Sequence, residues 1–171
     1  MDHLKALIRD VPDFPVEGIL FRDVTPLLRD AAALREVVHL FAQRYRKPNV
    51  DVVAGIESRG FIFGGPLAVE LGVGFVPIRK LGKLPAEKVR REYALEYGTN
   101  VLEMHVDAIR PGERVLLIDD LLATGGTARA SAELIEQVGG EVASVAFVIE
   151  LEFLGGRREL AGRDVFSLIR Y

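Results

Sequence analysis

The sequence is organised as short, continuous runs of Val, Ile and Leu that alternate with segments of helical periodicity. Five such runs lack the polar alternation of a half-exposed strand, as is typical of parallel strands covered on both faces. They are Val50–Ile56, Gly74–Ile78, Arg114–Asp119, Val142–Ile149 and Val165–Ile169. Strands that alternate with helices predict an α/β fold, here a doubly wound, mainly parallel five-stranded sheet with flanking helices.

Two segments between these runs show apolar residues at the three- and four-residue spacing of an amphipathic helix, namely Ala31–Arg46 and Ala128–Val138. Asp30 directly precedes the first segment and is a suitable N-cap residue, because its side chain can accept hydrogen bonds from free N–H groups of the first turn. Gly139 and Gly140 follow the second segment and predict its end.

Two other segments break this rhythm. Residues 1–29 hold several prolines around the apolar piece Ile19–Phe21, and we expect them to form a small N-terminal hood. Residues 79–100 hold a polar loop and the alternating sequence REYALEYG, which predicts an antiparallel extension carrying a flexible loop. A length of 171 residues fits a single domain, with a core at 30–171 that includes a mobile loop at about 79–92.

Composition excludes several classes of protein. Apolar residues make up 49% of the chain, which is enough for a packed core. The longest stretch without a charged residue is the ten residues 60–69, whereas a membrane helix needs about 20. The chain has no Cys and a net charge of −3, so thiol chemistry and a general attraction to nucleic acid are excluded. We therefore expect a cytoplasmic, globular protein whose partners include neither nucleic acid nor a membrane.

The strongest candidate site is the segment VLLIDDLLATGGTA (115–128). A strand leads into two adjacent acids, Asp119 and Asp120, and then through a Thr-Gly-Gly-Thr turn (124–127) into a helix. Ligands of open α/β sheets bind beyond the carboxyl ends of the strands, and free N–H groups at a helix N-terminus favour phosphate. Two carboxylates beside a phosphate suit a sugar phosphate, because they accept hydrogen bonds from vicinal hydroxyls and stabilise positive charge at an anomeric carbon.

A purely structural interpretation of the same segment is that the acids end a strand and the glycines form an ordinary turn. An isolated Asp-Asp pair would favour that interpretation, whereas the complete string between a strand and a helix favours a site. The segment matches neither a Walker loop nor the dinucleotide-binding fingerprint. A sugar phosphate is therefore the ligand that we expect.

The segment resembles the motif with which type I phosphoribosyltransferases bind 5-phosphoribosyl-1-pyrophosphate (PRPP). Five further segments cover nearly the whole chain in order and resemble the adenine phosphoribosyltransferase family. They are PDFPVEGILFRDVTPLL (12–28), GIESRGFIFGGPLA (55–68), IRKLGKLP (78–85), LEYG (95–98) and FLGGR (153–157). The resemblance implies transfer of the phosphoribosyl group from PRPP to adenine, giving AMP and pyrophosphate through an oxocarbenium-like transition state. It also implies the fold of that family, a homodimer, and Mg²⁺ carried by PRPP without direct protein ligands.

The resemblance further assigns roles to residues of the PRPP site. The loop that binds the 5′-phosphate consists of Ala123, Thr124, Gly125, Gly126 and Thr127. Asp119 and Asp120 are the catalytic acids that face the ribose hydroxyls. The pyrophosphate is expected to be bound by Ser58, Arg59, Gly60, Arg79, Lys80 and Lys83.

For the base, the resemblance assigns adenine binding to Leu20, Phe21, Arg22 and Leu154, with the backbone of Leu20 and Arg22 reading the adenine edge. Glu96 matches a catalytic residue that handles the purine proton, which a carboxylate of raised pKa can do. The open alternatives are ordinary core packing for the apolar residues and a salt-bridged surface position for Glu96. Two glycines after Leu154 predict a flexible stretch there.

The segment 79–91 carries six Lys or Arg residues and one acid, a net charge of +5 within a chain of net charge −3. A mobile cationic loop can close over pyrophosphate, exclude water and neutralise the charge of the leaving group. A solvated surface loop is the alternative, and the resemblance favours the functional interpretation. It also implies that Arg79 acts across a dimer, in the site of the partner subunit.

Two other functions stay open beside transfer to adenine. A 6-oxopurine phosphoribosyltransferase would need inverted base contacts, because its base presents an acceptor where adenine presents an amino donor. A non-catalytic, PRPP-sensing regulator would need an added nucleic-acid-binding surface, and no such segment precedes the motif. The FRD and LEYG matches favour adenine.

Overall fold

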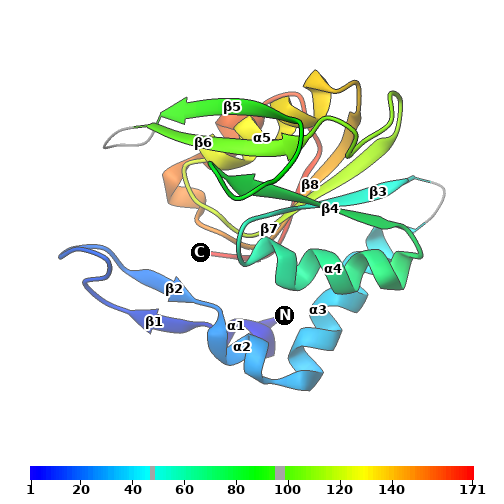
Figure 1. Cartoon of the computed structure of the whole chain (residues 1–171). Helices are drawn as coiled ribbons and strands as arrows, with labels where there is room; N and C mark the ends of the chain where they lie inside the picture. The colour runs from blue at the N-terminus through cyan, green and yellow to red at the C-terminus, as the bar shows by residue number, and fades with distance from the viewer. Residues whose placement is uncertain (47–48, 95–98) are drawn as a thin grey trace.

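The computed structural model describes residues 1–46, 49–94 and 99–171, and Figure 1 shows how they are arranged. A central seven-stranded sheet has the strand order β5-β6-β4-β3-β7-β8-β9. Five of its strands are the five predicted runs, and they pair in parallel. Their bounds are β3 Val52–Ile56, β4 Gly74–Lys80, β7 Arg114–Leu122, β8 Glu141–Glu150 and β9 Val165–Arg170. The predicted α/β fold with a mainly parallel sheet is thus confirmed.

The other two strands form the expected antiparallel extension. β5 (Lys88–Ala94) and β6 (Thr99–His105) pair with each other, and β6 pairs with the end of β4. The expected loop at about 79–92 is shorter in the structure, because β4 and β5 take up both of its ends. Only residues 81–87 of that range lie outside the strands.

Helices cover both faces of the sheet. α3 (Ala31–Arg44) begins where predicted, and the carboxylate of Asp30 accepts hydrogen bonds from the N–H groups of Ala32 at 2.9 Å and Ala33 at 3.0 Å. α5 (Gly126–Gln137) is the predicted helix after the candidate site, and it begins two residues earlier than expected. Among the described residues, no helix is long and apolar enough to cross a membrane.

Helix α4 (Gly60–Leu71) is not among the predicted helices, because its interior holds Gly64, Gly65 and Pro66. Close packing explains one of these residues. A Cβ atom on Gly64 would lie 2.7 Å from the ring of Phe75 in β4, so only glycine lets the helix lie this close to the sheet. Packing against the sheet therefore outweighs a poor local preference for helix.

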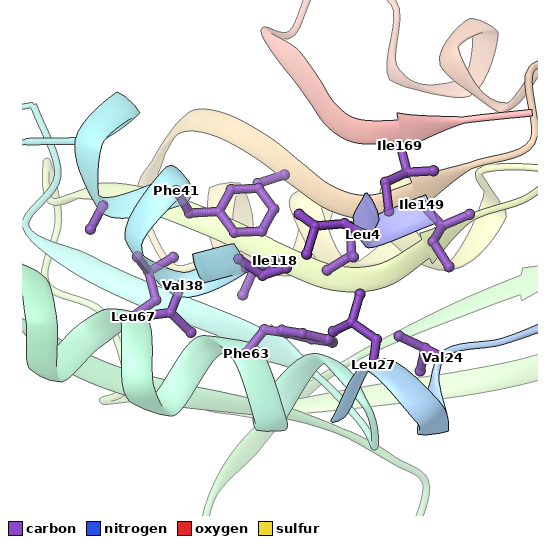
Figure 2. Close-up of a cluster of buried hydrophobic side chains, with 14 of the residues drawn as sticks. Leu4, Val24, Leu27, Val38, Phe41, Phe63, Leu67, Ile118, Ile149 and Ile169 are labelled. Atoms are coloured by element: carbon purple, nitrogen blue, oxygen red, sulfur yellow. The ribbon is translucent and has the colours of Figure 1, made fainter. Parts of the chain in front are cut away.

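Buried apolar side chains form one cluster on each face of the sheet. The cluster drawn in Figure 2 lies on the side of α3 and α4 and includes Phe41, Phe63 and Ile118. The other cluster lies on the side of α5 and includes Leu117 and Leu134. Two apolar layers of this kind hold the ends of β3, β4 and β7 in fixed positions.

The hood comprises α1 (Asp2–Lys5), β1 (Arg9–Val11), β2 (Phe21–Asp23) and α2 (Thr25–Arg29), and β1 and β2 form a separate antiparallel pair. Its apolar residues join the core cluster on the side of α3 and α4. Figure 2 shows Leu4, Val24 and Leu27 beside Phe63 and Ile118. The hood is therefore packed onto the sheet through the same core.

Candidate active site

The two candidate acids lie at the carboxyl end of β7. Asp120 is buried, with 6% of its surface exposed, and its carboxylate accepts a hydrogen bond from Nε of Arg59. The carboxylate of Asp119 accepts a hydrogen bond of 2.8 Å from the N–H of Asp120. Burial and the negative charge of Asp120 together raise the pKa of Asp119 well above its ordinary value. The two acids therefore have different hydrogen-bond partners: Asp120 bonds the side chain of Arg59, whereas Asp119 bonds a backbone N–H group.

The predicted pyrophosphate segment lies directly beside these acids. Gly60 begins α4, and a Cβ atom there would lie 2.8 Å from the carbonyl oxygen of Ile118 and 3.0 Å from Oδ1 of Asp119. Arg59 precedes the helix, and its guanidinium lies 5.9 Å from the ring centre of Phe21 in the hood. Residues from β7, from the start of α4 and from the hood thus meet around Arg59.

The predicted phosphate loop, 123–127, connects β7 to α5. Gly125 caps the helix with φ of +91°, a conformation that other residues rarely adopt. The first regular bond of the helix runs from the N–H of Arg129 to the carbonyl of Gly125, at 2.9 Å. Within the part of the chain that the structure describes, no hydrogen bond is formed by the N–H groups of residues 124–127. These N–H groups are the donors that an anion at a helix N-terminus would use.

The loop is held from behind by the short helix η2 (Gly156–Leu160). A Cβ atom on Gly125 would collide with the carbonyl oxygen of Gly156, and one on Gly156 would collide with the carbonyl oxygen of Ala123. Gly156 is buried in this contact, in the stretch that the sequence predicts to be flexible. The glycine is needed for close approach between two segments about 30 residues apart, which a single sequence does not reveal.

The cationic segment is tied to Glu57, a residue that the sequence analysis did not identify. The carboxylate of Glu57 accepts hydrogen bonds from the backbone N–H of Lys80 at 2.9 Å and from Nε of Arg79 at 3.1 Å. Burial alone would raise the pKa of Glu57, but these two hydrogen bonds lower it below its ordinary value. Its position directly before Ser58, within the motif GIESRGF, is the signal that could have pointed to it.

A second unexpected acid, Glu103 in β6, lies under the other end of this segment. Its side chain is fully buried and accepts hydrogen bonds from the N–H of Gly82 at 3.0 Å and from Nε of Arg90 at 2.8 Å. Gly82 belongs to the loop at 81–87, and Arg90 belongs to β5. Glu103 therefore joins the loop to the hairpin that carries it.

Two further cations of the segment 79–91, Lys80 and Lys83, are among the residues predicted to bind pyrophosphate. Lys80 and Lys83 are exposed, and the structure describes no contact of Lys83 with Asp119 or Asp120. The carbonyl of Lys83 accepts a hydrogen bond of 3.0 Å from Nη1 of Arg79. These cations thus form a group separate from the pair of acids.

In the hood, Phe21 is half-buried and meets the ring of Phe14 edge-on, with 5.2 Å between the ring centres. Leu20 is 44% exposed, and so available to a ligand. Leu154 is exposed at the end of η1 (Glu152–Leu154), two residues before Gly156, which packs on the loop at 123–127. Glu96 lies outside the described residues.

Comparison with known proteins tests the resemblance directly. The family model described as "Phosphoribosyl transferase domain" matches residues 23–165. An adenine phosphoribosyltransferase of Chloroflexus aurantiacus is 60% identical over 168 residues, which are 98% of this chain and 97% of the relative. The chain belongs to the adenine phosphoribosyltransferase family.

Solved structures of adenine phosphoribosyltransferases share the fold. The enzyme from Saccharomyces cerevisiae, complexed with an imino-altritol bisphosphate and adenine, is 42% identical, with a TM-score of 0.93 over 98% of this chain and 97% of the other. The enzyme from Trypanosoma brucei, complexed with AMP, pyrophosphate and ribose-5-phosphate, is 28% identical, with a TM-score of 0.91 over 99% of this chain and 78% of the other. The expectation of a type I phosphoribosyltransferase fold is therefore confirmed.

Proposed function

We propose that this protein transfers the 5-phosphoribosyl group from PRPP to adenine, giving AMP and pyrophosphate. The observation that carries the proposal is the junction of β7 and α5, where two acids stand beside a loop whose N–H groups at 124–127 are without partners among the described residues. Family membership and the adenine and AMP bound by two relatives support the choice of base.

The loop at 123–127 binds the 5′-phosphate. Its N–H groups and the positive end of the α5 dipole offer an anion several donors without a charged side chain. Asp119 and Asp120 accept hydrogen bonds from the ribose hydroxyls. As the bond to pyrophosphate breaks, positive charge develops on the anomeric carbon, and nearby carboxylates stabilise it.

Pyrophosphate lies on the other side of Asp120. The N–H groups of Ser58 and Gly60 and the guanidinium of Arg59 hold it, with further charge from Arg79, Lys80 and Lys83. Arg59 bonds Asp120 in the structure, and 44% of its side chain is exposed. In the proposal PRPP therefore replaces this ion pair: its diphosphate binds the guanidinium of Arg59, and its ribose hydroxyls hydrogen-bond to Asp120. Neither charge is left without a partner when the substrate binds.

Adenine lies between the hood and η1. The backbone groups of Leu20 and Arg22 read its edge, while Phe21 and Leu154 cover its faces, an arrangement of apolar walls with few polar groups that suits a flat base. Glu96 handles the purine proton in this proposal. Since Glu96 lies outside the described residues, this role rests on the match of LEYG to the family.

Mg²⁺ is the expected cofactor, bound to oxygens of PRPP. Within residues 1–46, 49–94 and 99–171, no three His, Asp or Glu side chains are grouped to hold a metal ion. Asp119 and Asp120 are oxygen donors, and the second already bonds Arg59. In this proposal Mg²⁺ has no direct protein ligand: as a hard cation it keeps several waters and takes its other ligands from PRPP. When bound, the ion neutralises charge on the diphosphate.

The protein is proposed to be a single-domain, cytoplasmic homodimer. Two apolar residues on the outer side of α4, Ile62 and Val69, are 40% and 82% exposed. Beside them, a surface cavity of about 580 Å³ lies between α3 and α4 and is lined by Leu34, Val38 and Pro66 among others. Exposed apolar surface of this kind suits a second copy. Arg79 lies on the neighbouring strand β4, where a rearrangement of its bond to Glu57 lets it reach a partner's site.

The test is incubation of the protein with PRPP, Mg²⁺ and each of adenine, hypoxanthine, guanine and xanthine, with separation of the nucleotides formed. AMP from adenine, with little product from the other three bases, is expected. Product mainly from an oxopurine would overturn the choice of base. No nucleotide from any base, with PRPP still bound, would identify a PRPP-sensing protein and overturn the proposed reaction.

A further inference from the structure

The geometry points to Tyr171 as a positioning residue that sets the distance between the two elements proposed to hold adenine. The inference rests on the proposed function, because it concerns the base site of the same reaction. Tyr171 itself is not proposed to touch adenine. It is connected to the hood on one side and to η1 on the other.

The ring of Tyr171 connects it to the hood. The guanidinium of Arg22 in β2 lies 3.8 Å from the ring centre, and Nζ of Lys5 in α1 lies 4.0 Å from it. Both distances are well within the range of cation–π attraction. Two hood elements, α1 and β2, thus face one half-buried ring, and Arg22 also pairs with Asp10 in β1. Figure 1 shows the chain end marked C, which is this residue, on the side of the sheet that faces β2.

The backbone of Tyr171 connects it to η1. Its N–H donates to the carbonyl of Glu150 at 3.0 Å, and its carbonyl accepts from the N–H of Glu152 at 2.9 Å. Glu152 begins η1, and this short helix ends at Leu154. Leu154, the residue proposed to cover one face of adenine, is therefore two residues from Glu152, which bonds the backbone of Tyr171.

These two sets of contacts place one residue between both walls of the proposed base site. Arg22 reads the base through its backbone in the proposal, and the position of that backbone depends on where its side chain is held. None of the contacts described for Tyr171 involves Asp119, Asp120 or the loop at 123–127. Loss of the ring is thus expected to weaken adenine binding while PRPP binding stays intact.

The experiment compares Tyr171→Leu with Tyr171→Phe, because phenylalanine keeps the ring that both cations face. The contacts described for Tyr171 use its ring face and backbone rather than its hydroxyl. In Tyr171→Leu we expect a five- to thirtyfold rise in the KM for adenine, the size of one or two lost cation–π contacts. The KM for PRPP is expected within twofold of wild type. Tyr171→Phe should restore the adenine KM to within twofold.

Lys5→Met provides a second variant in case Tyr171→Leu folds poorly. It removes one of the two cations and its hydrogen bond of 2.5 Å to the carbonyl of Arg170, while Arg22 stays on the ring. A two- to fivefold rise in adenine KM is expected. Equilibrium binding of adenine or AMP should show the same order of effects, and thermal unfolding reports whether each variant is folded.

Three outcomes would overturn the inference. They are an unchanged adenine KM in both Tyr171→Leu and Lys5→Met, equal rises in the KM values for adenine and PRPP, and a Tyr171→Phe variant as impaired as Tyr171→Leu. Each of these requires a wild-type protein that makes AMP. Failure of the wild type to form AMP would instead contradict the proposed function, so the two failures are distinguishable.

Discussion

The guanidinium of Arg59, just before α4, donates a hydrogen bond to the buried carboxylate of Asp120 at the end of β7. Arg59 lies between β3 and α4, whereas Asp120 lies within β7, and the two residues belong to different parts of the proposed PRPP site. Their ion pair keeps both charges compensated in the structure, and in the proposed function a diphosphate and a ribose replace it. Substitutions at this junction are therefore expected to affect catalysis more than folding.

Asp120→Asn should lower turnover by about 100-fold, because a preorganised charge next to the developing cation is lost. The fold should stay intact, since asparagine keeps the size of the side chain and an oxygen acceptor for Arg59. Initial rates of AMP formation and circular dichroism measure the two effects. Glu136→Gln, which removes a surface partner of Arg163, is the matched control and should keep wild-type turnover. Near wild-type turnover in Asp120→Asn would contradict the assigned role.

Asp119→Asn should raise stability while lowering activity. Burial and the charge of Asp120 raise the pKa of Asp119, so its ionised form destabilises the folded protein at neutral pH. Replacing the carboxylate is expected to increase the free energy of unfolding at pH 7 by about 1 kcal/mol or more.

The sign of the pH dependence follows from that raised pKa. The folded state holds the proton of Asp119 more tightly than the unfolded state, whose pKa is about 3.9. Stability from this group is present below the unfolded pKa and is lost as pH rises through the folded pKa. The advantage of Asp119→Asn in urea unfolding should therefore shrink as pH falls toward 4. An advantage that is constant with pH would argue against this account.

Gly125→Ala should weaken both the fold and PRPP binding, because its Cβ atom would collide with the carbonyl of Gly156 in η2. Gly162→Ala is a matched control: Gly162 has φ of +83° and nothing within 4 Å of an added Cβ atom. The control should lose only about 1 kcal/mol from the positive φ. Gly125→Ala should lose more and raise the PRPP dissociation constant at least tenfold, measured by calorimetry. Equal PRPP affinity in the two variants would count against the phosphate loop.

Glu103→Gln should reduce stability in a pH-dependent way. Burial alone would raise the pKa of Glu103, but the N–H of Gly82, the guanidinium of Arg90 and the charge of Lys88 lower it. A lowered folded pKa gives stability that is present above the unfolded pKa of about 4.3 and is lost as pH falls through the folded pKa. The difference in unfolding free energy between wild type and Glu103→Gln should be largest near pH 7 and vanish at low pH. A difference that grows with acid would have the wrong sign.

The sequence was sufficient for the parts of the fold that depend on local pattern. The parallel strands were predicted because a strand covered on both faces is apolar along its whole length, and Asp30 was predicted as a cap because capping involves neighbours in the chain. The β7–α5 junction was found for the same reason, since acids, glycines and helix start follow one another directly.

The parts that depend on contacts between distant segments were missed. Helix α4 was overlooked because Gly64 is required by a ring in β4 rather than by local preference. The close packing of Gly156 against the loop at 123–127 was also missed. The roles of Glu57 and Glu103 depend on pairing between strands that bring distant cations to them. These contacts join residues that are far apart in the chain, so no local spacing in the sequence predicts them.

The shared core of the hood has a consequence for substrate exchange. Leu4 and Leu27 are fully inaccessible to solvent within the same cluster as Ile118, so lifting the whole hood would expose apolar surface to water at high cost. The loop at 12–20, which joins β1 to β2, is less buried, since Phe14 and Val16 there are more than half exposed. We therefore expect adenine to enter and AMP to leave when this loop bends, while the buried part of the hood stays fixed during turnover.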